Sequence, residues 1–288
     1  MVVGRASAIA AVVCAMATVA HADEPTAPSD HPVVGEWLFD TEAMVFLWIP
    51  AIGTYYVDGH VAPRSSPLAF SVNEGGAERR RAYEIPGTAL TVGGVAVAGA
   101  MLLGDDPARF HHAKGLAESL STTGLVTATT KAIFGRHRPD YDPMLDGNEG
   151  RRSFPSGHAT RAFSVLTYAA LYLRYHGFDQ WREPGTTPWW EVAAYSGLGA
   201  LAVGFGAERV VRNRHNLSDV AAGSLIGAGG SIAFFYWQER QYRKTKRARR
   251  EALPIDLLGS PASHARAPGQ PDGLPPIHVP GLSFDGTF

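Results

Sequence analysis

The stretch FPSGHATRAFSVLTYAALYL, residues 154–173, places a short polar motif directly in front of a helical segment. A serine just before an apolar run is a typical N-cap, because its hydroxyl oxygen accepts a hydrogen bond from a free amide of the first turn. The run from Ala162 to Leu173 is apolar over helical length. We therefore predict a helix that is capped by Ser156 and carries Gly157 and His158 in its first turn.

Apolar segments of helical length recur along the chain, whereas the alternation typical of β-strands is scarce and no internal repeat is evident. The segment from Lys114 to Phe134 is more mixed, and it predicts a helix with one polar face. The apolar segments lie at 87–104, 162–173, 189–205 and 220–237. The sequence thus predicts an all-α fold, a helical bundle with about five or six core helices.

The N-terminus has the layout of a secretory signal peptide. Arg5 precedes an apolar run from Ala8 to Ala20, and Ala22 ends an Ala-His-Ala sequence suited to cleavage. An uncleaved anchor helix is the alternative, although the run is short for a membrane span. The single cysteine, Cys14, lies in this segment, so we expect no disulfide and no thiolate metal site in the mature chain.

Changes in composition divide the chain into four parts. Residues 1–22 are the expected signal peptide, and residues 23–86 are expected to form a linker and a short helical region. Residues 87–238 are the expected catalytic helical core. Residues 239–288 begin strongly basic and become rich in proline and glycine, which is typical of a disordered tail.

The overall composition is that of one folded domain with tails. The chain has 288 residues, of which 45% are hydrophobic and 18% charged, enough for one sizeable core. Its formal net charge of -1 argues against a surface built to bind nucleic acid, so no nucleic-acid partner is expected.

Three polar clusters interrupt the apolar core, each at the end of an expected helix. Fixed positive charge comes from Lys131, Arg138 and Arg209, and each guanidinium can bind two oxygens of a tetrahedral oxyanion. Gly157 permits close approach of the backbone, and Ser156 with the free amides of the helix start offers further donors. We therefore expect these residues to form one anion-binding site.

Two histidines in these clusters suit different steps of a phosphoryl transfer. Asp219 follows His215 by four residues, so on a helix its carboxylate can accept from one ring nitrogen and leave the other free as a nucleophile. His158 is then the general acid that protonates the leaving oxygen. This set predicts transfer through a phosphohistidine without a metal, and no metal ligand is assigned.

The clusters resemble the signature of the type 2 phosphatidic acid phosphatases, whose superfamily also holds bacterial class A acid phosphatases and vanadium haloperoxidases. Two parts of the signature match fully: lysine, six residues and arginine-proline at 131–139, and proline-serine-glycine-histidine at 155–158. The third part matches at Arg209, His215 and Asp219. The resemblance therefore rests on three motifs in the family's order and spacing.

The resemblance implies a helical bundle of this family's kind over residues 87–238. It implies His215 as the nucleophile, His158 as the acid and Asp219 as the residue that orients the nucleophile. The implied phosphate ligands are Lys131, Arg138, Ser156, Gly157 and Arg209. The chain departs from the pattern at Glu208, where the family usually has serine, and a carboxylate there is expected to tune or weaken anion affinity.

Six more basic residues occupy the same loops. Surface cations are usually solvated, so we expect a hydrated rim rather than a head-group site or a second phosphate site. These residues are Arg136, His137, Arg151, Arg152, Arg212 and Arg214.

Two locations fit the sequence, and in both the active site faces the periplasm. If the apolar segments span a bilayer, the basic residues 240–250 lie on the cytoplasmic side and the two histidines on the other. The low mean hydropathy of -0.07 keeps open a soluble periplasmic enzyme with a buried helical core. We expect a bacterial cell-envelope protein and favour embedding in the inner membrane.

The leading functional prediction is a metal-independent phosphatase that acts on lipid phosphate or pyrophosphate monoesters. Three alternatives stay open: a soluble periplasmic non-specific acid phosphatase, a vanadate-dependent haloperoxidase, and a non-catalytic envelope protein that binds anions. No cofactor is expected, and vanadate would be an inhibitor of the phosphatase or the cofactor of the haloperoxidase. The expected partners are a phosphorylated lipid or small phosphomonoester and the membrane.

Overall fold

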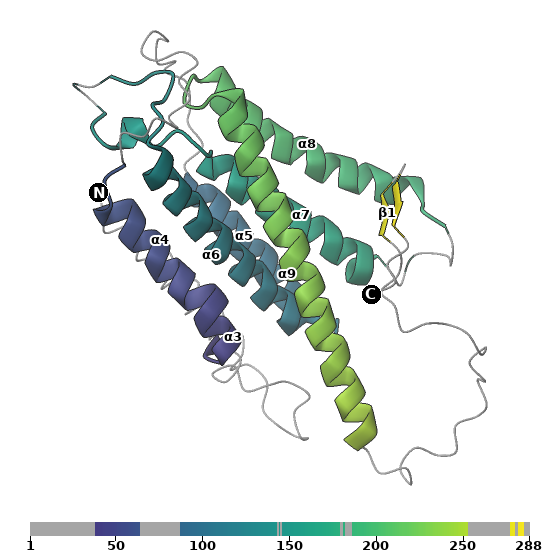
Figure 1. Ribbon diagram of the computed structural model, residues 1–288. Helices are drawn as coiled ribbons and strands as arrows, with labels where there is room; N and C mark the ends of the chain where they lie inside the picture. The colour runs from purple at the N-terminus through teal and green to yellow at the C-terminus, as the bar shows by residue number, and fades with distance from the viewer. Residues whose placement is uncertain are drawn as a thin grey trace, which may run out of the picture. The chain divides into compact units, whose positions relative to one another are not determined.

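The computed structural model describes residues 38–63, 87–142, 144, 146–178, 181, 186–252, 277–279 and 282–284 (Figure 1). The described part contains six long helices, as the sequence predicts: α4 (Ile49–His60), α5 (Gly87–Leu103), α6 (Arg109–Phe134), α7 (Gly157–Tyr172), α8 (Trp189–Val211) and α9 (Leu217–Ala252). The shorter elements are α3 (Thr41–Ala43), η1 (Met44–Trp48), η2 (Glu149–Arg151), η3 (Leu173–Gly177), β1 (Ile277–Val279) and β2 (Leu282–Phe284). The two strands pair antiparallel, and the all-α prediction is confirmed for the rest.

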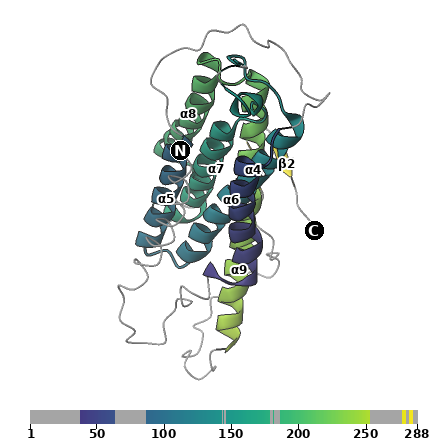
Figure 2. The same ribbon diagram turned by 90° about the vertical axis from the view of Figure 1, so that its left-hand side faces the viewer.

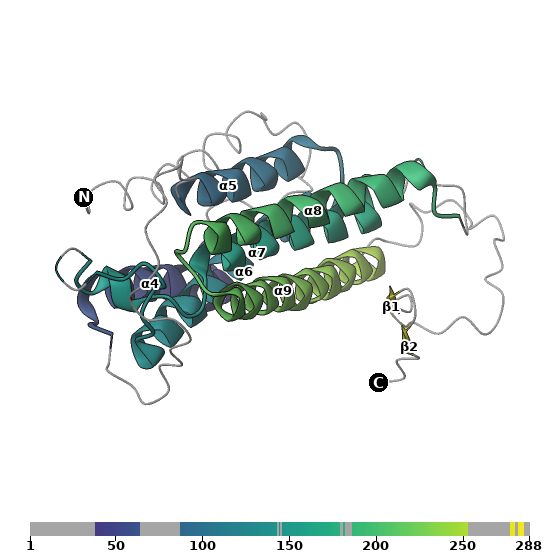
Figure 3. The same cartoon turned by 90° about the horizontal axis from the view of Figure 1, so that it is seen from above.

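The chain divides into two compact units, Met1–Lys244 and Thr245–Phe288. In the first unit α6 is central, since it packs against α4, α5 and α7, while α7 also packs against α5 and α8. α9 runs beside α6 and α7 (Figures 2 and 3). Ser231 of α9 joins both, because its hydroxyl donates to Ser164 O at 2.7 Å and lies 3.0 Å from the Ser119 hydroxyl.

The core between these helices is rich in aromatic side chains. Leu116 of α6, Tyr168 of α7 and Phe235 of α9 are fully buried. The rings of Tyr168 and Phe235 meet edge to face with centroids 5.6 Å apart, a favourable arrangement for aromatic pairs. One core thus holds together three helices that are far apart in the sequence.

Two glycines of α9 allow it to touch the backbone of α7. A Cβ at Gly223 would collide with Ser156 O, and a Cβ at Gly227 would collide with Thr160 O. Any larger residue would push the two helices apart, so this contact requires glycine. The close approach fixes the start of α9 against the start of α7, where two of the three polar clusters lie.

The end of α9 differs from the sequence prediction. The helix continues to Ala252, so the prediction that a disordered tail begins at residue 239 is wrong for its first part. Arginine, lysine, glutamate and glutamine are good helix formers, and Arg243 Nε donates to Glu239 Oε1 one turn earlier at 2.7 Å. The predicted signal peptide, residues 1–22, lies outside the described residues.

Candidate active site

The three polar clusters meet at one end of the first unit. Lys131 lies in the last turn of α6, Ser156 caps the start of α7, Arg209 lies in the last turn of α8, and Asp219 lies in the first turn of α9. The ends of these helices gather on the same side of the molecule (Figure 1). The antiparallel order of the helices therefore brings together residues from positions 131 to 219.

A glycine ends α6 and directs the chain into the first loop. Gly135 has φ 57°, a left-handed conformation that favours glycine, and its N–H donates to Lys131 O at 3.0 Å. The loop is then anchored by a hydrogen bond from Arg138 N to Gly150 O at 2.8 Å. These two backbone hydrogen bonds thus fix the position of Arg138, in the loop, relative to Lys131, in the last turn of α6.

The start of α7 has the geometry that the sequence predicts for a helix cap. Ser156 Oγ accepts from Ala159 N at 3.4 Å, and Ser156 is fully buried. A Cβ on Gly157 would lie 3.4 Å from Lys131 Nζ, so the ammonium group lies directly over the first turn. A helix N-terminus facing a partly buried lysine is a suitable anion site. Ser156 serves as the cap, and its role as a phosphate ligand stays a prediction.

The turn between α8 and α9 places His215 beside Arg209. Asn213 has φ 58°, a left-handed conformation that asparagine tolerates better than most residues. The amides of Arg214 and His215 then both donate to Arg209 O, at 3.1 and 3.2 Å. The chain folds back over the end of α8, and the imidazole of His215 is buried with 3% exposure.

The imidazole of His215 is oriented by a backbone carbonyl. Its Nδ1 lies 2.8 Å from Ser153 O, and because a carbonyl only accepts, Nδ1 carries the proton and Nε2 keeps the lone pair. Asp219 Oδ2 lies 3.8 Å from Nδ1, beyond hydrogen-bond distance. The prediction that Asp219 accepts directly from the ring is therefore corrected: Asp219 supplies nearby negative charge, and Ser153 supplies the acceptor.

Asp219 is occupied by other donors. Arg136 Nη1 donates to its Oδ1 at 2.7 Å, while Ser153 Oγ and Asn216 N donate to its Oδ2 at 2.6 and 2.8 Å. The Arg136 charge and the hydrogen bonds from Ser153 and the Asn216 amide stabilise the charged form of Asp219 in its buried position. Asp219 is therefore a buried, fully bonded carboxylate.

Two of the expected rim residues are in fact structural. Arg136 is only 2% exposed and also donates to Ser218 Oγ at 2.8 Å, so its assignment to a hydrated rim is wrong. Arg152 is buried as well and donates to Asp58 Oδ1 at 2.8 Å and to Val61 O at 2.6 Å. Burial of a guanidinium requires such partners, and these arginines tie the loops to the helices.

Charge within the cluster sets the protonation of its key groups. Burial and the positive charges of Arg138 and Lys131 outweigh Asp219 and lower the pKa of His215 to about 4. Burial, together with Arg138 and Arg161, lowers the pKa of Lys131 to about 8. Burial and the charge of Arg214 lower the pKa of Arg138 to about 10. At neutral pH the site thus combines a neutral imidazole with cationic neighbours.

His158 lies where the start of α7 meets the start of α5. A Cβ on Gly87 would be 3.3 Å from His158 Cε1 and 3.4 Å from Arg161 Nη1. Arg161 also lies near Gly157, 3.7 Å from the position of its Cβ. Arg161, which the sequence reasoning missed, therefore connects His158 to the Lys131 side of the site. Its position one helical turn after Gly157 was the available signal.

Glu208 is held between two arginines. Its Oε1 lies 2.5 Å from Arg212 Nε, and its Oε2 lies 3.5 Å from Arg209 Nη1. Arg209 is almost completely buried, as expected for an anion ligand at the floor of the site. The Glu208 carboxylate thus contacts Arg209, a predicted phosphate ligand, but its shorter and stronger ion pair is with Arg212.

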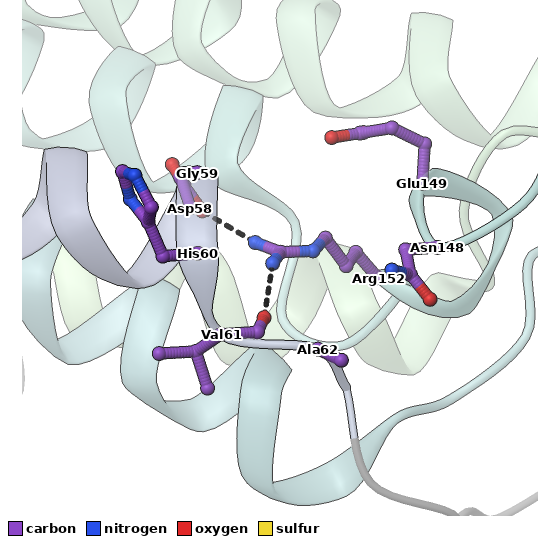
Figure 4. A pocket seen from close by; sticks show the side chains of 8 residues that line it. All are labelled: Asp58, Gly59, His60, Val61, Ala62, Asn148, Glu149 and Arg152. Carbon is purple, nitrogen blue, oxygen red and sulfur yellow. Dashed lines mark hydrogen bonds and ion pairs between the residues drawn. The ribbon is translucent and has the colours of Figure 1, made fainter.

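A polar cavity adjoins the cation cluster (Figure 4). It has a volume of about 140 Å³, and Arg152 spans it to reach Asp58 and Val61. Glu149 lines it too and lies 3.4 Å from Arg138 Nη2. The charges of Asp58 and Glu149 also act on Lys131, so the cavity lies next to the predicted phosphate ligands.

Comparison with known proteins identifies the family. Residues 113–243 match the PAP2 superfamily. This segment of the chain is similar to the members of that superfamily. The match covers α7, α8, most of α6 and most of α9, and with them every residue predicted for the site, which confirms the resemblance drawn from the three motifs.

Individual relatives match over 104 to 138 residues. The PA-phosphatase related-family protein of Dictyostelium discoideum is 31% identical over 134 residues, which cover 44% of this chain and 49% of that protein. Lipid phosphate phosphatase 1 of Arabidopsis thaliana is 30% identical over 138 residues, 41% of each chain. Lipid A 1-phosphatase of Porphyromonas gingivalis is 36% identical over 104 residues, 36% of this chain and 18% of that protein. The chain thus spans less than half the length of these relatives, and no solved structure gives a significant match.

Proposed function

We propose that the protein is a phosphatase that hydrolyses lipid phosphate or pyrophosphate monoesters through a phosphohistidine, without a metal at the reacting phosphorus. The observation that carries the proposal is the setting of His215. Its Nδ1 is fixed on Ser153 O at 2.8 Å, and burial among cations holds its pKa at about 4. Nε2 therefore presents a lone pair beside Lys131 and Arg138 at neutral pH.

Two steps complete the reaction. In the first, His215 Nε2 attacks phosphorus, the bond to the leaving oxygen breaks, and His158 gives that oxygen its proton. In the second, His158 takes a proton from water, the water oxygen attacks phosphorus, and the phosphorus–nitrogen bond breaks to release inorganic phosphate. Both residues return to their starting states, so the cycle is balanced.

The cations stabilise charge that develops on the phosphoryl oxygens. Arg209 is buried, and Lys131 and Arg138 are partly buried, and a donor shielded from water acts more strongly on a transition state than one in water. Removing one such donor costs on the order of 10²–10³ in kcat in other enzymes. We assign these three residues and the α7 amides at Gly157 to phosphate binding.

A lipid substrate and membrane association are supported by the surface. Within the described residues one helix, Leu217–Ala248, is long and apolar enough to cross a bilayer, and 28% of its apolar window is buried. A core helix of a soluble protein would be mostly buried. Large apolar side chains are also exposed on neighbouring helices, among them Ile52, Val92, Leu201 and Val203. Exposure of large apolar side chains on several helices favours contact with lipid.

The names of the relatives point the same way, since they include lipid phosphate phosphatases and a lipid A 1-phosphatase. We therefore propose phosphorylated lipids as the substrate class and the bacterial inner membrane, with the site facing the periplasm, as the location. Vanadate, which resembles the trigonal transition state of the phosphoryl group, is proposed as an inhibitor.

A hydrolysis panel tests the proposal. Detergent-extracted and soluble fractions are assayed for phosphate release from lipid phosphates, lipid diphosphates and water-soluble monoesters, and the phosphoenzyme is trapped with labelled substrate. We expect lipid turnover in the detergent fraction and an acid-labile phosphoenzyme that His215→Ala lacks. Turnover of soluble monoesters alone would indicate a periplasmic acid phosphatase instead. Phosphate binding without turnover would indicate an anion-binding protein, and halide oxidation with vanadate and peroxide a haloperoxidase.

A further inference from the structure

A second cluster of titratable side chains lies far from the candidate active site. It contains His112 from the first turn of α6, His176 from η3 and Glu239 from α9. Along α6, His112 and Lys131 are separated by about 28 Å at a rise of 1.5 Å per residue. The cluster is therefore independent of the phosphate site.

Both imidazoles direct Nε2 at the same carboxylate oxygen. His112 Nε2 lies 3.3 Å and His176 Nε2 3.1 Å from Glu239 Oε2, and one ligand atom from each residue fits within 4.8 Å. With metal–ligand bonds of about 2.0–2.1 Å, neighbouring ligands of a tetrahedral zinc ion lie about 3.3–3.4 Å apart. The separation of 3.3 Å has this length and that of 3.1 Å is slightly shorter, while the two nitrogens, which lie within 4.8 Å of each other, reach it by rotation of the imidazoles.

The second nitrogen of each ring has its own polar neighbour. The Tyr168 hydroxyl lies 3.3 Å from His112 Nδ1, and Asp106 Oδ2 lies 3.1 Å from His176 Nδ1. Histidines that bind metals commonly donate the other N–H to such a group, which orients the ring and leaves Nε2 free for the ion. Both rings thus have the outer contacts that a metal site needs.

Glu239 is also positioned for this role. Arg243 Nε donates to its Oε1 at 2.7 Å, so Oε2 is the oxygen directed at the histidines. His112 is completely buried and Glu239 nearly so, which distinguishes the cluster from the exposed acidic groups common on protein surfaces. A buried carboxylate with two imidazole nitrogens directed at the same oxygen is an arrangement that could bind one cation.

We propose that His112, His176 and Glu239 bind one divalent metal ion of the zinc class, with water as the fourth ligand. Two nitrogens and one oxygen suit zinc, whereas magnesium and calcium prefer oxygen ligands alone. The ion joins α6, η3 and α9 at the end of the unit remote from the phosphate site. Its role is structural, and the proposed phosphatase reaction does not use it.

Zinc uptake by the purified full-length protein tests this proposal. After treatment with a chelator and dialysis against Zn²⁺, the wild type is expected to retain one equivalent by elemental analysis, and Co²⁺ is expected to give the visible absorption of a four-coordinate ion. Excess Mg²⁺ is expected not to compete. His176→Ala is expected to lower the Zn²⁺ affinity by more than about 100-fold and Asp106→Asn by about 10–100-fold, the usual effect of losing an outer contact.

His111→Gln is the matched control, since this neighbouring histidine of α6 does not belong to the cluster, and we expect it to bind Zn²⁺ like the wild type. Circular dichroism checks the fold of each variant. If His176→Ala does not fold, the Zn²⁺ affinity of Asp106→Asn tests the proposal in its place. The proposal is overturned if the wild type retains no more Zn²⁺ than a His176→Ala/Glu239→Gln variant. It is equally overturned if Asp106→Asn and every folded ligand variant bind as tightly as the wild type. Either result would leave a metal-free hydrogen-bonded network.

Discussion

The two ends of the first unit surround their histidines with opposite charge. At one end His215 lies among Lys131, Arg138 and Arg209, and burial together with Arg138 and Lys131 lowers its pKa to about 4. At the other end burial acts in the same direction on His176, but Asp106 and Glu239 outweigh it and raise the pKa to about 9. The same side chain is thus a neutral nucleophile in one place and a partner of carboxylates in the other.

Burial lowers the pKa of both histidines, and the neighbouring charges decide whether that effect is reinforced, as at His215, or overcome, as at His176. A cationic setting attracts phosphate and keeps the imidazole unprotonated. An anionic setting attracts protons or a metal ion. The experiments below test this contrast between the cationic and the anionic end.

The largest effect is expected from His215→Ala. Loss of the nucleophile should lower kcat by roughly 10⁴-fold or more, because the remaining groups have no other route to a covalent intermediate. Phosphate release from a lipid phosphate measures it. The matched variant at the anionic end, His176→Ala, should keep kcat within a factor of a few, and a large loss there would contradict the separation of the two ends.

Arg136→Met tests whether the buried arginine supports Asp219. It leaves the carboxylate without its 2.7 Å partner, and losing one member of a buried ion pair costs about 3–5 kcal/mol. Denaturant unfolding measures the change in the free energy of unfolding. Arg240→Met removes an exposed arginine of α9 and should change it by less than about 0.5 kcal/mol. Equal effects of the two substitutions would indicate that Arg136 is a solvated surface residue, as the sequence predicts.

Gly227→Ala tests the close contact between the backbones of α9 and α7. Its Cβ would collide with Thr160 O, so we expect a loss of about 1–3 kcal/mol in the free energy of unfolding. Gly229→Ala is the control, because its Cβ would meet nothing within 4 Å, and helix propensity predicts a gain of about 0.5–1 kcal/mol. The two substitutions should therefore change the free energy of unfolding in opposite directions. A stabilising Gly227→Ala would contradict the close packing.

The pH profile of kcat/KM reports the cationic end of the free enzyme. Below about pH 4 protonation removes the lone pair of His215. The basic limb lies no higher than about pH 8, where Lys131 loses the charge that binds phosphate, because His158 must also keep its proton to act as the acid. Activity should fall about tenfold per pH unit outside this window. Bound phosphate keeps Lys131 protonated, so the basic limb of kcat should lie at higher pH than that of kcat/KM. An acid limb near the ordinary histidine value of about 6.5 would show that the cations do not control His215.

The smallest effect is expected from Glu208→Ser, which introduces the residue usual in the family. Removing a carboxylate 3.5 Å from Arg209 should lower KM by roughly two- to fivefold, in keeping with a partly exposed ion pair. The KM for one lipid phosphate measures it at fixed ionic strength. Arg212→Ala frees Glu208 from its stronger partner and should move KM in the opposite direction. A higher KM in Glu208→Ser would show that the carboxylate assists binding.

The helices and the three polar clusters were predictable because both leave local signals. Apolar segments of helical length fix α5, α7, α8 and most of α9, and polar motifs mark the helix ends. The cap at Ser156 follows from the same local rule. The basic end of α9 was grouped with the tail because the last apolar segment ends near residue 238, although the residues involved are good helix formers.

The partners within each end were not predictable, because they depend on contacts between distant residues. Arg136 and Arg138 are alike in sequence, yet only Arg136 reaches Asp219, which is 83 residues away. The acceptor for His215 is a backbone oxygen, and a main-chain atom leaves no mark in residue type. The anionic end likewise joins His112 to Glu239 across 127 residues, with none of the short spacings by which metal sites are recognised.

α9 is one unbroken helix from the turn beside the nucleophile to the remote histidine cluster, so a small tilt of the helix moves its ends by a larger distance. Over its roughly 30 Å between Asp219 and Glu239, a tilt of about 2° shifts one end by about 1 Å. A misplacement of about 1 Å can cost 10²-fold in rate. The close contacts of Gly223 and Gly227 with α7, which limit such a tilt near the site, therefore help to keep the catalytic groups aligned.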